Sequence, residues 1–313
     1  MCIRDRYITS AEQEENTLNE KLLLAVNPNS GDGIAKHWIY EMVSLLSEKY
    51  KFVTVYLSKA QGDIINTVST YAKDYDAVIC CGGDGTLNET LNGVYKSGKN
   101  IPVGYIPTGT TNDFASSHGI PKNIKAALSQ LSQAEPHNYD MGKLGDKIFS
   151  YVAAFGAIIE VCYNTPQADK ASFGRMAYLA EGAKKLQDLK PLKMKITCGE
   201  RIIYGDFVFG MVTNSISAGG FKMFPGGTAD MLRDGKFEVT LVSYPQNITE
   251  FQQAVKALFK PSVESKLVTR LTAEKVTMEF LCDPPEWTVD GEFGGKYEKV
   301  DAEILPGKLL LLE

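Results

Sequence analysis

Residues 77–89 read AVICCGGDGTLNE and decide the fold of this chain. The apolar run over 77–81 is typical of a buried strand, and apolar residues recur at helical spacing over 87–95. The glycines between them are therefore predicted to form a strand-to-helix turn. A hairpin is the alternative for the dipeptide Asp84-Gly85, but no second alternating strand follows it.

The predicted turn is suited to binding phosphate. Its glycines allow backbone N–H groups to approach a polyphosphate, because no Cβ stands in the way, and the start of the helix adds partial positive charge. Asp84 places one carboxylate in the turn, where it can hold a metal ion that in turn holds the phosphates. The stretch therefore predicts a phosphate site at the beginning of a helix.

Strand and helix patterns alternate on both sides of this turn. Predicted strands over 21–26, 52–57 and 101–106 are each followed by a helical pattern. Such alternation predicts a parallel sheet covered on both faces, which binds ligands at the carboxyl ends of its strands. Four polar, glycine-bearing loops fall at that edge, over 27–33, 58–63, 82–89 and 107–113.

The pattern changes at about residue 140, where strand-like runs become dominant. The sequence predicts a disordered tail of mixed charge over 1–20, an α/β domain over 21–139 and a mainly antiparallel β domain over 140–313. Whether the last strand returns to the first domain is left open. The predicted strands of the second half are 149–155, 193–197, 201–213, 236–244, 267–271, 275–281 and 308–312, with helices over 173–189 and 248–259.

Composition narrows the classes of function. The 313 residues carry a net charge of -5, which argues against a dedicated nucleic-acid binder. Nothing in the sequence resembles a membrane span of about 18 apolar residues or a secretory signal, and the six cysteines lack zinc spacing. A cytoplasmic protein with reduced thiols is the expectation.

Three of the loops together resemble the catalytic domain of the bacterial diacylglycerol kinases, soluble lipid kinases similar to sphingosine and ceramide kinases. The run Asn27-Pro28-Asn29-Ser30-Gly31 resembles the family's first nucleotide loop, 82–89 its glycine-rich signature and 107–113 its third loop. The likeness continues through 154–157, 234–235 and 290–292. NAD kinases and phosphofructokinases carry a similar glycine signature, but the joint set in this order is specific.

The resemblance implies a nucleotide-binding α/β domain followed by a β-rich domain, with ATP across the cleft between them. It implies ATP and Mg²⁺ as cofactors. Ser58 stands where many members have Thr, which keeps the hydroxyl. The nucleotide-binding residues that it implies are Asn27, Pro28, Ser30, Gly31, Ser58, Gly82, Gly83, Asp84, Gly85, Thr86, Asn88, Glu89, Gly109, Thr110, Asn112 and Asp113.

Two magnesium positions are implied by the same resemblance. Asp84 and Asp113 match the carboxylates that organise catalytic Mg²⁺. Asp234 matches a structural Mg²⁺ position, where backbone carbonyls at Met231 and Lys236 join the carboxylate. Most of the octahedral shell of such a site is expected to be water.

Asp290 and Glu292 match the acidic pair from which the family's general base is drawn, and Asp290 is the favoured member. The implied mechanism has glycine-loop amides and magnesium holding ATP, while Asp290 or Glu292 takes a proton from a lipid hydroxyl that attacks the γ-phosphate in line. Asp84 completes the catalytic set. The product is a lipid phosphate similar to phosphatidic acid. Residues 153–159 and the helix over 173–189 are candidates to line or gate the lipid cleft.

The implied partner is a membrane lipid, reached by transient contact with the cytoplasmic face of the bilayer, and a homodimer is the default assembly. Diacylglycerol, monoacylglycerol, a sphingoid base and a polyprenol all remain open as acceptors. Two alternatives also remain: a kinase of a soluble acceptor such as NAD, and a non-catalytic protein that binds nucleotide or lipid. The loop over 107–113 resembles the lipid-kinase version, which argues against a soluble acceptor. Every acidic residue that the reaction would use is present, which argues against a non-catalytic protein.

Overall fold

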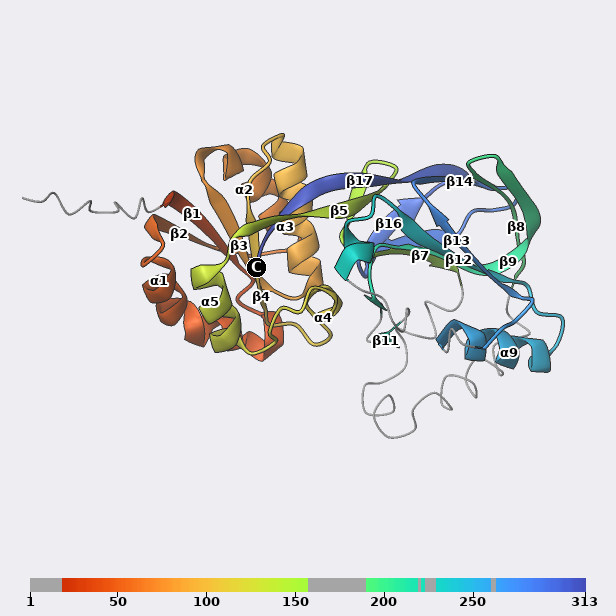
Figure 1. Cartoon of the computed structure of the whole chain (residues 1–313), viewed down its shortest axis with the longest axis horizontal. Helices are drawn as coiled ribbons and strands as arrows, with labels where there is room; N and C mark the ends of the chain where they lie inside the picture. Colours follow the sequence, from red (N-terminus) through yellow and green to blue (C-terminus); the bar gives the residue numbers. More distant parts are fainter. Residues whose placement is uncertain (1–18, 157–189, 219–220, 223–228, 260–262) are drawn as a thin grey trace, which may run out of the picture.

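The structure, a computed structural model, describes residues 19–156, 190–218, 221–222, 229–259 and 263–313. It consists of two lobes that two long strands connect (Figure 1). The predicted helix over 173–189 and residues 157–159 of the predicted lipid cleft lie outside the described residues. No helix within the described ranges is long and apolar enough to cross a bilayer.

The first lobe is a parallel sheet in the order β2-β1-β3-β4, with helices on both faces (Figure 1). This confirms the α/β fold that the alternating pattern predicts. The strands are β1 (Asn19–Val26), β2 (Tyr50–Leu57), β3 (Ala77–Gly82) and β4 (Val103–Pro107). The helices are η1 (Ser30–Trp38), α1 (Ile39–Leu46), α2 (Asp63–Tyr71), η2 (Ala72–Asp74), α3 (Asp84–Ser97), α4 (Asp113–Ser117) and α5 (Ile124–Gln133).

Strand β1 shows why this sheet needs a continuous apolar run. Leu23 and Ala25 pack into the core under α2 and α3, while Leu22 and Leu24 pack into the opposite core under α1 and α5. Both faces of the strand are buried, so alternation with polar residues is absent. The strand begins at Asn19, inside the predicted tail, because Asn19 continues the ladder opposite Tyr50 of β2.

The first polar loop departs from the helix that the sequence predicts after it. Gly31, Asp32 and Gly33 all have positive φ, at 59°, 56° and 82°, so the chain cannot continue directly into an α-helix. The 3-10 segment over Ser30–Trp38 that precedes α1 is therefore kinked at these three residues.

The second lobe is mainly antiparallel, as predicted, in the order β16-β15-β7-β9-β8-β14-β17 with β12 and β13 beside β9. Its buried core includes Trp287, Phe155 and Phe280, whose rings pack against one another. Helix α9 (Ile248–Phe259) occupies the predicted range. The other elements are β5 (Pro136–Leu144), β6 (Lys147–Phe149), β7 (Val152–Gly156), β8 (Leu192–Cys198), β9 (Arg201–Thr213), β10 (Ser217–Ala218), β11 (Phe221–Lys222), η4 (Ala229–Leu232), β12 (Phe237–Ser243), β13 (Val268–Ala273), β14 (Lys275–Phe280), β15 (Glu286–Val289), β16 (Glu292–Lys296) and β17 (Lys299–Leu312).

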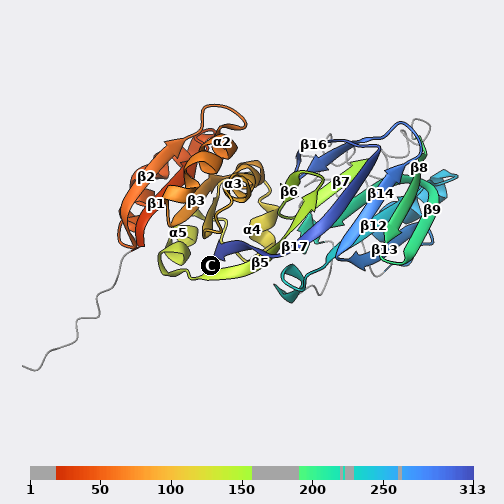
Figure 2. The same ribbon diagram turned by 90° about the horizontal axis from the view of Figure 1, so that it is seen from above.

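Strand β17 joins the two lobes and is much longer than the predicted 308–312. It pairs antiparallel with β14 and β5, and at Leu311 it pairs parallel with Val103 of β4. Figures 1 and 2 show β5 and β17 running side by side from one lobe to the other. A bulge around Gly307, at φ 62°, interrupts the ladder between Leu305 and Leu309. The two lobes therefore share one continuous sheet.

The hairpin of β15 and β16 was not predicted as a strand pair. Its turn is Asp290-Gly291, with φ of 48° and 87°, and positive φ at both central residues is the form that matches strand twist in two-residue turns. Asp-Gly is one of the dipeptides that commonly form such a turn, so the turn itself is what the local sequence favours. Its position beside the first lobe, however, is a property of the tertiary fold.

Candidate active site

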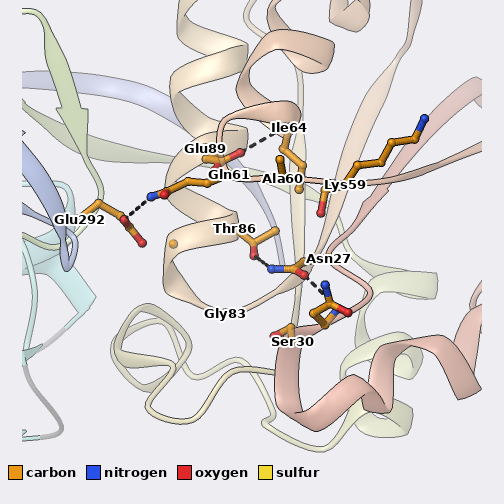
Figure 3. Close-up of a pocket in the computed structure, with 13 residues that line it drawn as sticks. Asn27, Ser30, Lys59, Ala60, Gln61, Ile64, Gly83, Thr86, Glu89 and Glu292 are labelled. Carbon is orange, nitrogen blue, oxygen red and sulfur yellow. Dashed lines mark hydrogen bonds between the residues drawn. The ribbon is translucent and has the colours of Figure 1, made fainter.

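A pocket of about 370 Å³ opens where three of the four predicted loops meet, beside the start of α3 (Figure 3). Its walls come from the ends of β1, β2 and β3, as expected for the carboxyl edge of a parallel sheet. Glu292, the first residue of β16, is the one lining residue from the second lobe in the described part of the chain. The lining residues are Asn27, Asn29, Ser30, Ser58, Lys59, Ala60, Gln61, Ile64, Gly83, Gly85, Thr86, Glu89 and Glu292.

The loops that form the pocket are bonded to one another. The Asn27 side chain donates to the Thr86 hydroxyl at 3.2 Å, which links the first loop to α3. The Thr108 hydroxyl donates to the Ser30 hydroxyl at 2.9 Å, which links the first loop to the fourth. Polar side chains thus reach the pocket already oriented by neighbouring loops.

The start of α3 has the features of a phosphate-binding helix terminus. Asp84 is the first helical residue, and Gly83 precedes it in an extended conformation and has no side chain with which to cap the first turn. A Cβ on Gly109 would lie 2.6 Å from the Cα of Gly83, so the fourth loop needs glycine where the two backbones meet. Backbone N–H groups are consequently available at the pocket floor.

The fourth loop supports the pocket and contributes none of its lining residues. The buried Asn112, at φ 52°, accepts from Gly109 N at 3.0 Å and donates to Gly109 O at 2.8 Å. Its side chain therefore shapes the loop, although the sequence placed it with the nucleotide. Thr110 is exposed beside it. The lining also lacks six other predicted nucleotide residues, which are Pro28, Gly31, Gly82, Asp84, Asn88 and Asp113.

Asp84 and Asp113 lie together, as the predicted catalytic metal position requires. The Asp84 carboxylate accepts from the backbone N–H groups of Asp113 and Phe114, at 3.1 and 3.4 Å, and so caps α4. Burial raises the pKa of Asp84 to about 6, and the charges of Asp113 and Asp290 add to that rise. The position therefore brings negative charge and carboxylate oxygens together.

That charge and the oxygen donors fit a hard divalent cation such as Mg²⁺. Within the described ranges, no three His, Cys, Asp or Glu side chains gather closely enough to hold a metal by themselves. Phosphate oxygens and water would have to complete the shell, as is usual for Mg²⁺ with nucleotides.

Asp234, the predicted structural metal residue, lies away from the pocket in the segment between η4 and β12. Its carboxylate is exposed and accepts from Lys236 N at 2.9 Å. Burial raises the pKa of Glu238 to about 7, and the charge of Asp234 contributes. The adjoining Gly235 N–H donates to the buried Asp140 of β5 at 2.7 Å, which ties this segment to the strands that connect the lobes.

The Asp290 carboxylate is a buried acceptor of hydrogen bonds, and its residue is 2% exposed. Oδ2 accepts from Asn88 Nδ2 at 2.8 Å and from the backbone N and hydroxyl of Ser150 at 2.7 and 2.9 Å. Oδ1 accepts from the backbone N of Tyr151 and Val152 at 3.1 and 3.0 Å. Burial raises the pKa of Asp290, and these bonds oppose the rise. Asp290 thereby links residues 150–152, where β6 is connected to β7, to Asn88 of α3.

Asp290→Asn is expected to reduce the free energy of unfolding by about 2 kcal/mol, because an amide NH₂ must then face buried donors on one side. Urea denaturation of the metal-free protein measures this. Glu292→Gln is the matched control, since the same change on an exposed side chain should leave stability within about 0.5 kcal/mol. A fully stable Asp290→Asn protein that has lost its activity would contradict the structural role.

Two residues that the sequence did not single out as site residues bind the lobes and loops together. Asn92 of α3 exchanges hydrogen bonds with the backbone of Ile148, at 3.0 and 3.1 Å, so the helix pairs with the edge of β6. Gln61 donates to Glu292 Oε2 at 2.7 Å across the pocket mouth (Figure 3). An isolated Asn or Gln in a sequence does not indicate such a contact. The sequence predicted only that the loop containing Gln61 lies at this edge of the sheet.

Family models, curated proteins and solved structures that resemble this chain all point to diacylglycerol kinases. A family model described as the diacylglycerol kinase catalytic domain matches residues 21–144, and the YegS C-terminal NAD kinase beta sandwich-like domain matches 151–313. The diacylglycerol kinase of Bacillus subtilis (strain 168) is 28% identical over 290 residues, which are 91% of each chain. That of Staphylococcus aureus (strain JH9) is 29% identical and covers 95% of this chain and 91% of its own. A Bacillus anthracis crystal structure, described as a proposed diacylglycerol kinase, has a TM-score of 0.78 at 25% identity and covers 96% of this chain and 97% of its own.

Proposed function

Because this chain belongs to the diacylglycerol kinase family, as its motifs predicted, we propose that it transfers the γ-phosphate of ATP to the hydroxyl of diacylglycerol or a related membrane lipid. One observation carries the proposal. The pocket formed by the predicted nucleotide loops also contains Glu292, a carboxylate from the second lobe. A nucleotide phosphate and a group able to activate an acceptor are thus brought to one place.

In this proposal the phosphates of ATP lie at the first turn of α3. Backbone N–H groups around Gly83 and Gly85 donate to them, and the helix terminus favours their charge. Asn27 and Ser30, which line the pocket and are bonded to neighbouring loops, orient the nucleotide. The protein contributes positioning and charge stabilisation, which is what phosphoryl transfer asks of it.

The geometry supports Glu292 as the general base, in place of the Asp290 that the sequence favours. Both oxygens of Asp290 accept bonds from buried donors, and its side chain lines no part of the pocket. Glu292 lies in the pocket and accepts a hydrogen bond from the Gln61 side chain. We therefore propose that Glu292 accepts the proton of the lipid hydroxyl. Asp290 orients the β15–β16 hairpin that carries Glu292.

Asp84 with Asp113 would hold the catalytic Mg²⁺, and Asp234 with the carbonyls of Met231 and Lys236 would hold the structural one. When bound, the catalytic ion neutralises phosphate charge. The acceptor is a lipid in a bilayer, so we also propose transient contact with the cytoplasmic face of the membrane. A homodimer stays a prediction.

The test is transfer of labelled γ-phosphate from ATP, with and without Mg²⁺, to mixed micelles that contain one lipid alcohol at a time. Magnesium-dependent labelling of diacylglycerol or a related lipid is expected. A parallel reaction offers NAD, because the second-lobe family is described by its likeness to an NAD kinase domain. Label in a phosphorylated dinucleotide, with none in lipid, would contradict the proposal.

A further inference from the structure

We propose that Gln61 is a positioning residue for Glu292: it holds this carboxylate against the first turn of α3, at the phosphate end of the pocket. The inference rests on the proposed lipid kinase reaction and adds Gln61, which lies in the predicted loop over 58–63 but is not among the predicted site residues. Its starting point is the hydrogen bond from Gln61 Nε2 to Glu292 Oε2, at 2.7 Å, between residues far apart in the chain.

The other oxygen of Glu292 fixes where the carboxylate lies. A Cβ on Gly85 would be only 2.8 Å from Glu292 Oε1, so this oxygen rests on the bare backbone of α3 at its second residue. The carboxylate is thus held between the Gln61 amide and the helix terminus. The first turn of α3 is also where the terminal phosphate of a nucleotide would end. Glu292 therefore lies next to the reacting phosphate only while it keeps this position.

The loop that presents Gln61 is itself fixed. Glu89 of α3 accepts from Gly62 N at 2.7 Å and from Ile64 N at 3.2 Å, which caps α2. Asp63 Oδ2 accepts from the backbone N–H groups of Lys59 and Ala60, at 2.8 and 3.2 Å. Glu89, which the sequence placed with the nucleotide, thus uses its carboxylate to hold the Gln61 loop to α3.

An amide suits this role for a chemical reason. Gln61 donates a hydrogen bond that fixes the direction of the carboxylate, yet it brings no positive charge that would form an ion pair with it. Glu292 can therefore be held in place and still accept a proton. Since both side chains are exposed, the bond contributes orientation more than stability, and Gln61 can be replaced without loss of the fold.

The experiment replaces Gln61 by Met, which has similar length and no donor, in wild type and in a Glu292→Gln background. Gln61→Met should lower kcat for lipid phosphorylation about 10-fold, the size expected for loss of a hydrogen bond to a charged group. The KM for ATP and the Kd of a non-hydrolysable ATP analogue should stay within about twofold. In the Glu292→Gln background the same replacement should change kcat by less than about twofold. Gln253→Met, an exposed change on α9, is the control.

A structural role for the loop alone would weaken nucleotide binding, because Gln61, Lys59 and Ala60 line the pocket. The inference would be overturned if Gln61→Met lowered kcat equally in both backgrounds, or if Gln61→Met kept the wild-type kcat. In either case, lipid phosphorylation by the wild-type protein would leave the proposed function intact. Absence of lipid phosphorylation by wild type would instead overturn the proposed function, and the positioning role with it.

Discussion

Glu292→Gln is expected to lower kcat for lipid phosphorylation by about 10²–10⁴-fold, the range attributed to general acid–base catalysis. The substitution keeps the size of the side chain and an oxygen that can accept from Gln61, but an amide cannot take a proton from an attacking hydroxyl. The Kd of ATP should stay the same or become tighter, since a negative charge leaves the pocket. Single-turnover kinetics and calorimetry measure the two quantities.

Glu286→Gln is the matched control, because Glu286 is an exposed carboxylate at the other end of the same hairpin and lines no part of the pocket. It should retain wild-type kcat. The comparison with Asp290→Asn decides the assignment of the base. If Glu292→Gln keeps more than a tenth of wild-type kcat, while Asp290→Asn is fully folded and inactive, the base is Asp290.

Asp84→Asn is expected to lower the rate of transfer strongly and yet stabilise the metal-free protein at neutral pH. Removal of the carboxylate should reduce kcat by about 10³-fold, as for loss of one preorganised group that stabilises charge. The stabilisation follows from the pKa of about 6, against 3.8 as the ordinary value. A raised pKa means that folding disfavours the charged form. This penalty is absent below about pH 3.8 and complete above about pH 6.

The gain in free energy of unfolding for Asp84→Asn should therefore grow between about pH 4 and pH 6, towards an upper limit of about 3 kcal/mol. Urea denaturation in EDTA at several pH values measures it. Asp74→Asn, an exposed change in the same lobe, is the control, and it should show neither effect. A variant less stable than wild type at pH 7.5 would show that the cap on α4 outweighs the buried charge.

The sequence predicts elements where local pattern decides structure. The buried run before Gly82, the glycine turn and the helix that ends at Gly98 all follow from neighbouring residues, and the structure contains them. The β15–β16 hairpin was missed because its strands are short and glycines at 294 and 295 interrupt the second one. Strand β17 was shortened because Pro306-Gly307 indicates a turn, whereas the structure absorbs this dipeptide in a bulge.

The candidate site was predictable as a place but not as a set of contacts. Residue type and order bring three polar loops to one edge, and the pocket lies there. Residue type and order do not determine whether a carboxylate or amide side chain points into the pocket or bonds to the backbone of a neighbouring loop. Asn112 and Glu89 satisfy loop N–H groups, and Asp290 satisfies a strand corner. These partners, like Gln61 for Glu292, are set by tertiary packing alone.

Strand β17 also has a consequence for synthesis of the protein. Leu309 and Leu311 complete the core of the first lobe, and Leu311 pairs with Val103 of β4, although both are made after every other described strand. A nascent chain that has emerged only as far as β5 would leave the edge of β4 open and apolar, a surface that chaperones recognise and that promotes aggregation. The first lobe therefore depends on β17, the last strand of the chain, to complete its sheet and its core.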